Sequence, residues 1–313
     1  MFWNPDKSLR RLEFKKPFTE RYRVEQTSEI TMSSLVIRTV TEWRWDVRIL
    51  KTDDQYYNIE LLSLDNVLLE TNNPNMRDLS AFNNAFKRMY SELNMIINHQ
   101  GELIRINNIE TIQRKWAQVK AEMEAIQTKH DNMRGMIALN DELFNNVSNI
   151  TEAVKGNEFF EIFFNVFMGV DLPGNKNLKK KSLFAQDFIN WKYEINSTAH
   201  QADELIINVI GKPNQDFDKS WLKRAYGSFP ITEIANRKPQ VWDQAKYKID
   251  KSSGRLLEGR LTKEEIVHED FLKAKMEYYI IADNPVATPQ QPETKVKTDS
   301  VQPDTRSGSF IMD

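Results

Sequence analysis

Apolar residues recur at alternating four- and three-residue intervals through the middle of the chain, from Ile112 to Val147. This period places the side chains on one stripe of a helix, and such a stripe needs a surface to pack against. The pattern therefore predicts a long amphipathic helix, which Gly135 or the Asn145-Asn146 dipeptide can bend or break. The stripe consists of Ile112, Trp116, Val119, Met123, Ile126, His130, Met133, Ile137, Asn140, Phe144 and Val147.

Alternation of apolar and polar residues with a period of two predicts antiparallel strands on both sides of this helix. Residues 43–49 alternate Trp, Trp, Val and Ile with charged side chains, and residues 191–195 and 272–280 show the same pattern. The stretch 35–40 is the predicted partner strand of 43–49. Further strands are predicted at 56–62, 94–98, 102–106, 204–210, 246–250 and 255–261, and shorter helices at 79–93, 157–168 and 218–226.

Changes in this pattern divide the chain into six segments. These are an N-terminal basic and aromatic segment (1–18), a first strand-rich region with one helix (19–107), a central helical region (108–170), a loop (171–182), a second strand-rich region (183–283) and a tail (284–313). The tail is polar and proline-rich without apolar periodicity, which predicts disorder. The predicted fold class is α+β: antiparallel β-strands from both halves of the chain packed with a central helical segment, and a disordered C-terminal tail.

The composition excludes several classes of protein. The 313 residues are 40% hydrophobic and 11% aromatic, enough for a substantial core, and the formal net charge of −2 gives no long-range field for nucleic acid or an anionic membrane. The chain has no cysteine, which excludes disulfides, thiol catalysis and thiolate zinc sites. Neither a signal peptide nor an apolar run long enough to span a membrane is visible, so a cytoplasmic protein is expected.

The sequence contains no recognisable catalytic or metal-binding motif. None of the four histidines pairs with another at the spacing of a zinc helix, and the ten glycines form no phosphate-binding loop. We therefore expect no catalytic residues, no metal site and no cofactor, and a non-catalytic protein is favoured over an enzyme. His130, within the helical stripe, has a second interpretation as a buried pH-responsive group.

Large aromatic residues fall on one face of the predicted strands. This face is either an ordinary aromatic core or the wall of a curved sheet that encloses an apolar ligand. The second interpretation is loosely similar to open-barrel carriers of lipids. The residues are Trp43, Trp45, Tyr57, Trp191, Tyr193 and Tyr278.

Three consecutive apolar residues, Phe310, Ile311 and Met312, lie at the end of the tail and predict a tethered docking tip. Together with the helical stripe, this tip favours a non-catalytic protein-interaction or scaffolding function, with another protein as the partner. The alternative is a carrier of a hydrophobic or lipid-like ligand held by the aromatic sheet face. A hydrolase-type enzyme without a recognisable motif is the third interpretation.

Overall fold

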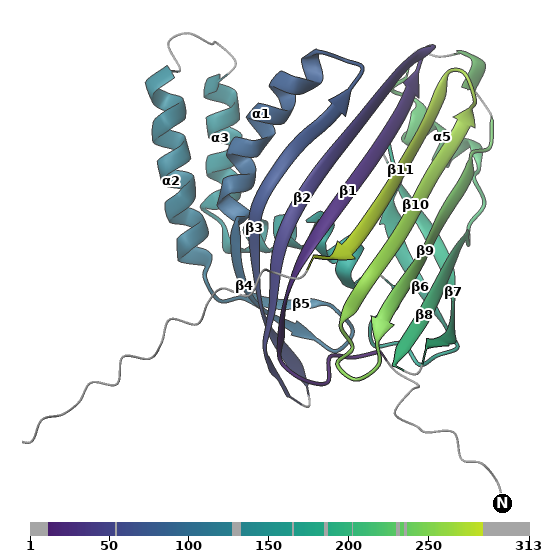
Figure 1. Ribbon diagram of the computed structural model, residues 1–313. Helices are drawn as coiled ribbons and strands as arrows, with labels where there is room; N and C mark the ends of the chain where they lie inside the picture. The colour runs from purple at the N-terminus through teal and green to yellow at the C-terminus, as the bar shows by residue number, and fades with distance from the viewer. Residues whose placement is uncertain are drawn as a thin grey trace, which may run out of the picture.

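A single curved antiparallel sheet of eleven strands organises the computed structural model (Figure 1). The structure describes residues 12–283, except 54, 127–132, 165, 185–186, 202, 230–231 and 235–236. The strand order is β5-β4-β3-β2-β1-β11-β10-β9-β8-β7-β6. Because the first strand pairs with the last, two meanders, β1 to β5 and β6 to β11, join at the centre of one sheet.

The strands range from four to eighteen residues in length. They are β1 (Phe18–Met32), β2 (Leu35–Thr52), β3 (Tyr56–Thr71), β4 (Glu92–Asn98), β5 (Leu103–Ile106), β6 (Gly174–Lys181), β7 (Phe188–Gln201), β8 (Glu204–Pro213), β9 (Gln240–Asp250), β10 (Leu256–His268) and β11 (Leu272–Ala282).

The longest helix has 18 residues, the same length as the longest strand. They are α1 (Asn75–Lys87), α2 (Ile109–Ile126), α3 (Met133–Phe144), α4 (Val147–Lys155) and α5 (Lys219–Tyr226), with 3-10 turns at Arg88–Tyr90 and Thr232–Ile234 and a π-helical turn at Phe160–Phe164. None of the helices in the described part of the chain has the length and apolarity that a membrane crossing requires.

The α+β prediction with a central helical segment is wrong. Half of the described residues lie in strands and 27% are helical, and the strands of both halves form one sheet. Two strands that the sequence pattern did not predict, β1 and β6, account for much of the difference between the predicted and observed strand content. The inward face of β1 carries polar residues in its second half, which hides the alternation. Strand β6 is polar and rich in lysine, and it lies within the segment 171–182 that was expected to be a loop. Lysines are typical of an exposed edge strand, because they discourage pairing with another chain. The predicted disordered tail lies outside the described residues.

The prediction of one long amphipathic helix is also wrong, because the stripe folds back on itself. Helices α2 and α3 run antiparallel, and Asp141 of α3 accepts hydrogen bonds from Trp116 Nε1 at 2.9 Å and Lys120 Nζ at 2.6 Å. The rings of Trp116 and Phe144 stack at 5.2 Å. Asn146 then caps α4 by accepting from two backbone N–H groups. The described stripe residues Ile112, Trp116, Val119, Met123, Ile137 and Phe144 are therefore buried within the chain, whereas Val147 is 52% exposed. His130 lies outside the described residues.

The alternation at 43–49 identifies a real strand with its correct inner face. Trp43, Trp45, Val47 and Ile49 are buried, whereas Arg44 is exposed. The predicted partner, 35–40, instead belongs to the same strand, β2, whose neighbours are β1 and β3. The hairpin at 94–106 is confirmed, and Gly101 in its turn has a φ of +81°.

An aromatic segment that follows α4 fills the concave face of the sheet. Three of its rings pack on rings of the sheet. The ring centroids are 5.5 Å apart for Phe159 and Trp45 of β2, 5.3 Å for Phe163 and Tyr22 of β1, and 4.3 Å for Phe167 and Tyr247 of β9. The helix predicted at 157–168 is thus largely a π-helical turn followed by hydrogen-bonded turns. This segment crosses from one half of the sheet to the other and supplies its core.

A cluster of charged side chains connects this aromatic segment to strands β6 and β10 in the second half of the sheet. Glu161 Oε1 lies 2.8 Å from Lys180 Nζ of β6 and 2.8 Å from Lys263 Nζ of β10. Lys180 also pairs with Asp243, which accepts a hydrogen bond from the Tyr193 hydroxyl at 2.7 Å. Burial opposes ionisation of Glu161, but the two ammonium groups outweigh it and lower the pKa of Glu161 to about 2.

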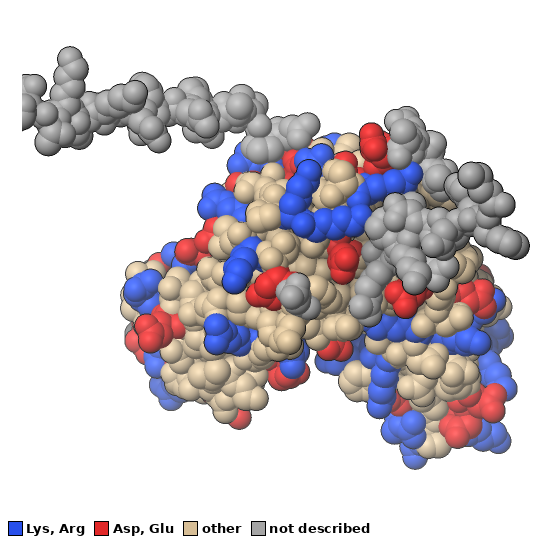
Figure 2. Space-filling view, turned by 90° about the horizontal axis from the view of Figure 1, so that it is seen from below, with Lys and Arg blue, Asp and Glu red and all other residues tan. Residues whose placement is uncertain are grey.

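Seen from below, the molecule is indented between two lobes (Figure 2). Lys and Arg side chains are interspersed with Asp and Glu over the described part of this face, and neither sign dominates. This agrees with the formal net charge of −2.

Candidate functional site

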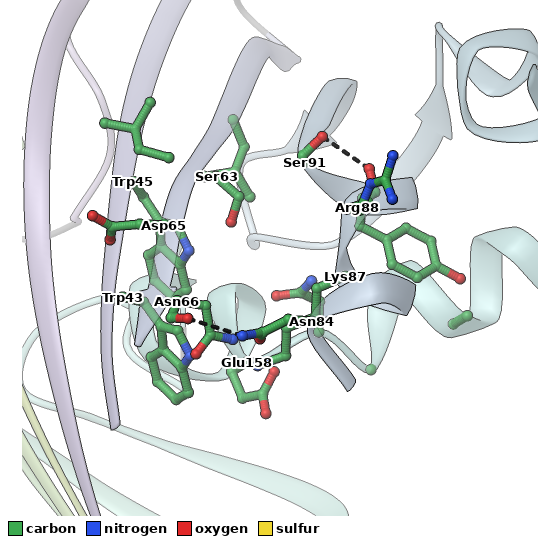
Figure 3. Close-up of a pocket in the computed structure, with 16 residues that line it drawn as sticks. Trp43, Trp45, Ser63, Asp65, Asn66, Asn84, Lys87, Arg88, Ser91 and Glu158 are labelled. Atoms are coloured by element: carbon green, nitrogen blue, oxygen red, sulfur yellow. Dashed lines mark hydrogen bonds between the residues drawn. The ribbon is translucent and has the colours of Figure 1, made fainter. Parts of the chain in front are cut away.

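A cavity of about 450 Å³ lies between the inner face of the sheet and the helices beside it. Strands β2 and β3 form one wall. The end of α1 with the 3-10 turn after it forms a second wall, and the residues around the end of α4 form the third. Figure 3 shows that side chains from these three elements point toward a common space. We refer to this space as the Trp43 cavity.

Two tryptophans make the sheet wall of the Trp43 cavity rigid and apolar. The rings of Trp43 and Trp45 are parallel within 3°, with centroids 6.0 Å apart, because both residues point to the same face of β2. Trp45 packs edge-on against Phe159, and Trp43 stacks on Tyr278 of β11 at 6.3 Å. Each tryptophan is only 5% exposed. Packing on both sides therefore fixes the orientation of the wall.

Two buried polar atoms of this cavity have no hydrogen-bond partner within the described residues. They are Trp43 Nε1, a donor, and Asp65 Oδ1, an acceptor. The second oxygen of Asp65 lies 3.7 Å from Arg44 Nη1, so the charge of this carboxylate is partly compensated. Buried polar atoms are normally hydrogen-bonded, and unpaired ones in a cavity are groups that a ligand can satisfy.

The cavity also holds a cation, Lys87, close to its aromatic wall. Lys87 Nζ lies 5.2 Å from the centroid of the Trp43 ring, and Lys87 forms no ion pair within the described ranges. Burial lowers the pKa of Lys87, and the charge of Glu158 opposes this shift. The neighbouring Arg88, in contrast, is bound by Glu122 through contacts of 2.8 and 3.2 Å. Lys87 is therefore the cation that remains available to a ligand.

The six aromatic residues predicted to share one face of the strands do not all line the Trp43 cavity. All six are buried, but only Trp43 and Trp45 line the Trp43 cavity, with Tyr278 behind Trp43. Tyr57 lies deeper in the core, where its ring stacks on His99 at 4.5 Å. The remaining pair, Trp191 and Tyr193, stack on each other at 6.0 Å in the other half of the sheet.

Sequence reasoning missed the polar residues of this cavity. Asp65 lies on β3, Lys87 at the end of α1 and Glu158 after α4, so no local spacing connects them. The only available signal was the i, i+3 spacing of Asn84 and Lys87, which places both on one side of a helix. The predicted docking tip, Phe310, Ile311 and Met312, lies outside the described residues.

Across the ranges that the structure describes, no group of three or more His, Asp or Glu side chains is arranged to hold a metal ion.

Comparisons with known proteins identify no family. No family model and no curated protein matches the chain in sequence. One similar solved structure is that of lipovitellin, described as showing lipid–protein interactions, with 9% sequence identity and a TM-score of 0.42. The match covers 88% of this chain and 26% of the lipovitellin chain, so this chain spans about a quarter of that protein's length. A similarity of this size assigns neither a fold nor a function to the chain.

Proposed function

We propose that this protein binds an amphipathic, lipid-like ligand with an anionic end in the Trp43 cavity, and that it holds or carries this ligand without transforming it. The observation that supports this function is the presence, in one cavity, of a rigid aromatic wall and an ammonium group that forms no ion pair within the described part of the chain. The proposal corresponds to the lipid-carrier interpretation of the sequence. Of the six aromatic residues predicted for the ligand-binding face, only Trp43 and Trp45 line the proposed site.

The apolar part of the ligand packs against the aromatic wall. A volume of about 450 Å³ falls within the range of about 300–1,000 Å³ that is typical of small-molecule sites. Covering apolar surface releases about 25 cal/mol for each Å² removed from water, so hydrocarbon against Trp43 and Trp45 supplies most of the affinity. Because these rings are already packed, binding does not require them to be ordered first.

The anionic end of the ligand meets the two unpaired donors, Lys87 Nζ and Trp43 Nε1. A cation that has lost part of its hydration gains more from an anion than a fully solvated one does. The charge of Glu158 acts on Lys87 and competes with an anionic ligand, so the anionic end must gain more from Lys87 Nζ and Trp43 Nε1 than it loses to this carboxylate. A carboxylate or phosphate group has the required chemistry.

The apolar stripe no longer supports the protein-interaction interpretation. The sequence leaves open whether the apolar stripe packs on the sheet or on a second chain, and Trp116, Met123 and His130 favour packing within the chain. In the structure α2 packs on α3, and the first part of the stripe is buried in the common core. No feature of the described residues favours a scaffolding function.

Displacement of a fluorescent fatty acid tests the proposed function. We expect hexadecanoate to displace the probe from the wild-type protein. Lys87→Gln should weaken hexadecanoate binding roughly tenfold, because a charge-assisted hydrogen bond contributes about 1.5–3 kcal/mol and Lys87 keeps part of its exposure to water. The same variant should leave the affinity for hexadecanol, which has no charge, nearly unchanged.

Lys155→Gln is the matched control, because Lys155 is an exposed lysine of α4 that pairs with Glu152 and does not line the cavity. It should bind both compounds as the wild type does. If the wild type binds neither compound, or if the two lysine variants behave alike, the proposed function is wrong.

A further inference from the structure

A second cavity of about 440 Å³ adjoins the Trp43 cavity. It lies between the later part of β3 and α1, and its lining includes Leu68, Thr71, Arg77 and Ser80. Asn66 and Asn84 line both cavities. The two spaces are therefore neighbours along the same groove, with β3 on one side and α1 on the other.

One hydrogen bond marks the boundary between the two cavities. Asn84 Nδ2 of α1 donates to the backbone oxygen of Asn66 on β3 at 3.1 Å (Figure 3). This oxygen belongs to the residue paired with Trp43 in the sheet register, so the bond lies at the edge of the aromatic wall. An asparagine side chain rotates readily, and a single hydrogen bond contributes only about 0.5–1.5 kcal/mol.

One apolar residue, Leu68, follows this boundary on the same face of the sheet. Asn66 pairs with Trp43, and Leu68 pairs with Thr41 two residues away on the same strand, so Leu68 follows Asn66 on the face that carries Trp43. Helix α1 covers this stretch, and Asn73 Oδ1 accepts from the Asn75 backbone N–H at 3.1 Å at its start. Its N-cap, Pro74, provides no side-chain hydrogen bond, and Leu79 on α1 is 47% exposed. The cover above the second cavity is thus helix α1.

We infer that the two cavities form one channel beneath α1, that the Asn84–Asn66 hydrogen bond is its internal gate, and that the ligand is a single long-chain anionic amphiphile. This inference rests on the proposed function and specifies its ligand. The anionic end lies at Lys87. The chain runs along the Trp43 wall, displaces the Asn84 side chain and continues past Leu68 beneath α1.

A series of fatty acids of increasing chain length tests the gate. Affinity should rise about threefold to fourfold with each CH₂ group while the chain fills the Trp43 cavity. The rise should then pause at the length where the chain meets the Asn84 side chain. In Asn84→Ala this pause should disappear, and acids beyond that length should bind twofold to tenfold more tightly than to the wild type. Shorter acids should bind both proteins equally.

Asn83→Ala is the matched control, because Asn83 is the exposed neighbour of Asn84 on the same helix. Both substitutions change helix propensity equally, so any effect of stabilising α1 appears in both variants. The inference is overturned if Asn84→Ala and Asn83→Ala give the same dependence on chain length, or if the wild type shows no pause. Failure of every fatty acid to bind the wild type would instead refute the proposed function.

Discussion

Replacing Glu161 by Gln is expected to destabilise the protein by about 2 kcal/mol at neutral pH. The carboxylate contacts two ammonium groups, those of Lys180 and Lys263, and 28% of its side chain is exposed. Burial disfavours the charged form, yet the ammonium groups lower the pKa of Glu161 from 4.5 to about 2. This difference between the unfolded and folded states corresponds to about 3 kcal/mol. Screening by water at the exposed part reduces the contribution to about 2 kcal/mol.

The assay is urea-induced unfolding followed by tryptophan fluorescence at several pH values. Because the pKa of Glu161 is lower in the folded state, its contribution is complete above pH 4.5 and is lost as the pH falls toward 2. The difference in unfolding free energy between the wild type and Glu161→Gln should therefore shrink by about half between pH 6 and pH 3. Glu152→Gln, which removes the exposed pair with Lys155, is the control and should cost less than about 0.5 kcal/mol. A loss no larger than that of the control, or a difference that does not change with pH, would refute the reasoning.

Two further substitutions test the core and a helix cap. Phe163→Ala should lower the free energy of unfolding by about 3–4 kcal/mol, because this ring is 2% exposed and stacks on Phe159 at 5.1 Å; a loss below about 1 kcal/mol in chemical denaturation would show that the segment does not fill the sheet. Asp218→Ala should cost about 1 kcal/mol, since Asp218 caps α5 by accepting from the Trp221 backbone N–H at 2.7 Å. The neighbouring exposed Asp216→Ala should leave the melting temperature unchanged, and equal effects of the two variants would contradict the capping role.

Strands with a clear inner face were predictable from the sequence, whereas their arrangement in one sheet was not. Alternation at 43–49 and 191–195 identified residues that are buried on one face of β2 and β7. Strand β1 was missed because Gln26 and Ser28, which are polar, occupy inward positions where the pattern requires apolar residues. Its pairing with β11, more than 230 residues later, depends on contacts that no local pattern encodes.

The prediction of one long helix was wrong because a local pattern does not show where a helix ends or what it packs against. An apolar stripe indicates that one helix face is buried, but not whether the partner is another chain or a later part of the same chain. The seven-residue period continues from Trp116 to Phe144 across the end of α2, so two antiparallel helices have the same sequence pattern as one long helix. Asn146 was a true breaking point, because its side chain caps α4.

The aromatic half of the candidate site was predictable, and its polar half was not. Trp43 and Trp45 stand out because they lie two residues apart on one strand. Lys87 becomes significant only when α1 places its ammonium over the Trp43 ring, and this depends on how α1 packs beside β3. Asn84 likewise gains a role only from the position of Asn66 on the facing strand.

Ligand binding in the Trp43 cavity is tested most directly by quenching of tryptophan fluorescence with a spin-labelled fatty acid, which quenches the rings nearest to its label most strongly. The wild type should show saturable quenching. Trp43→Phe combined with Trp45→Phe should lose the saturable part, whereas Trp191→Phe, which changes a buried ring of similar exposure in the other half of the sheet, should retain it. Saturable quenching that persists in the double variant, or that disappears in Trp191→Phe, would contradict binding in this cavity.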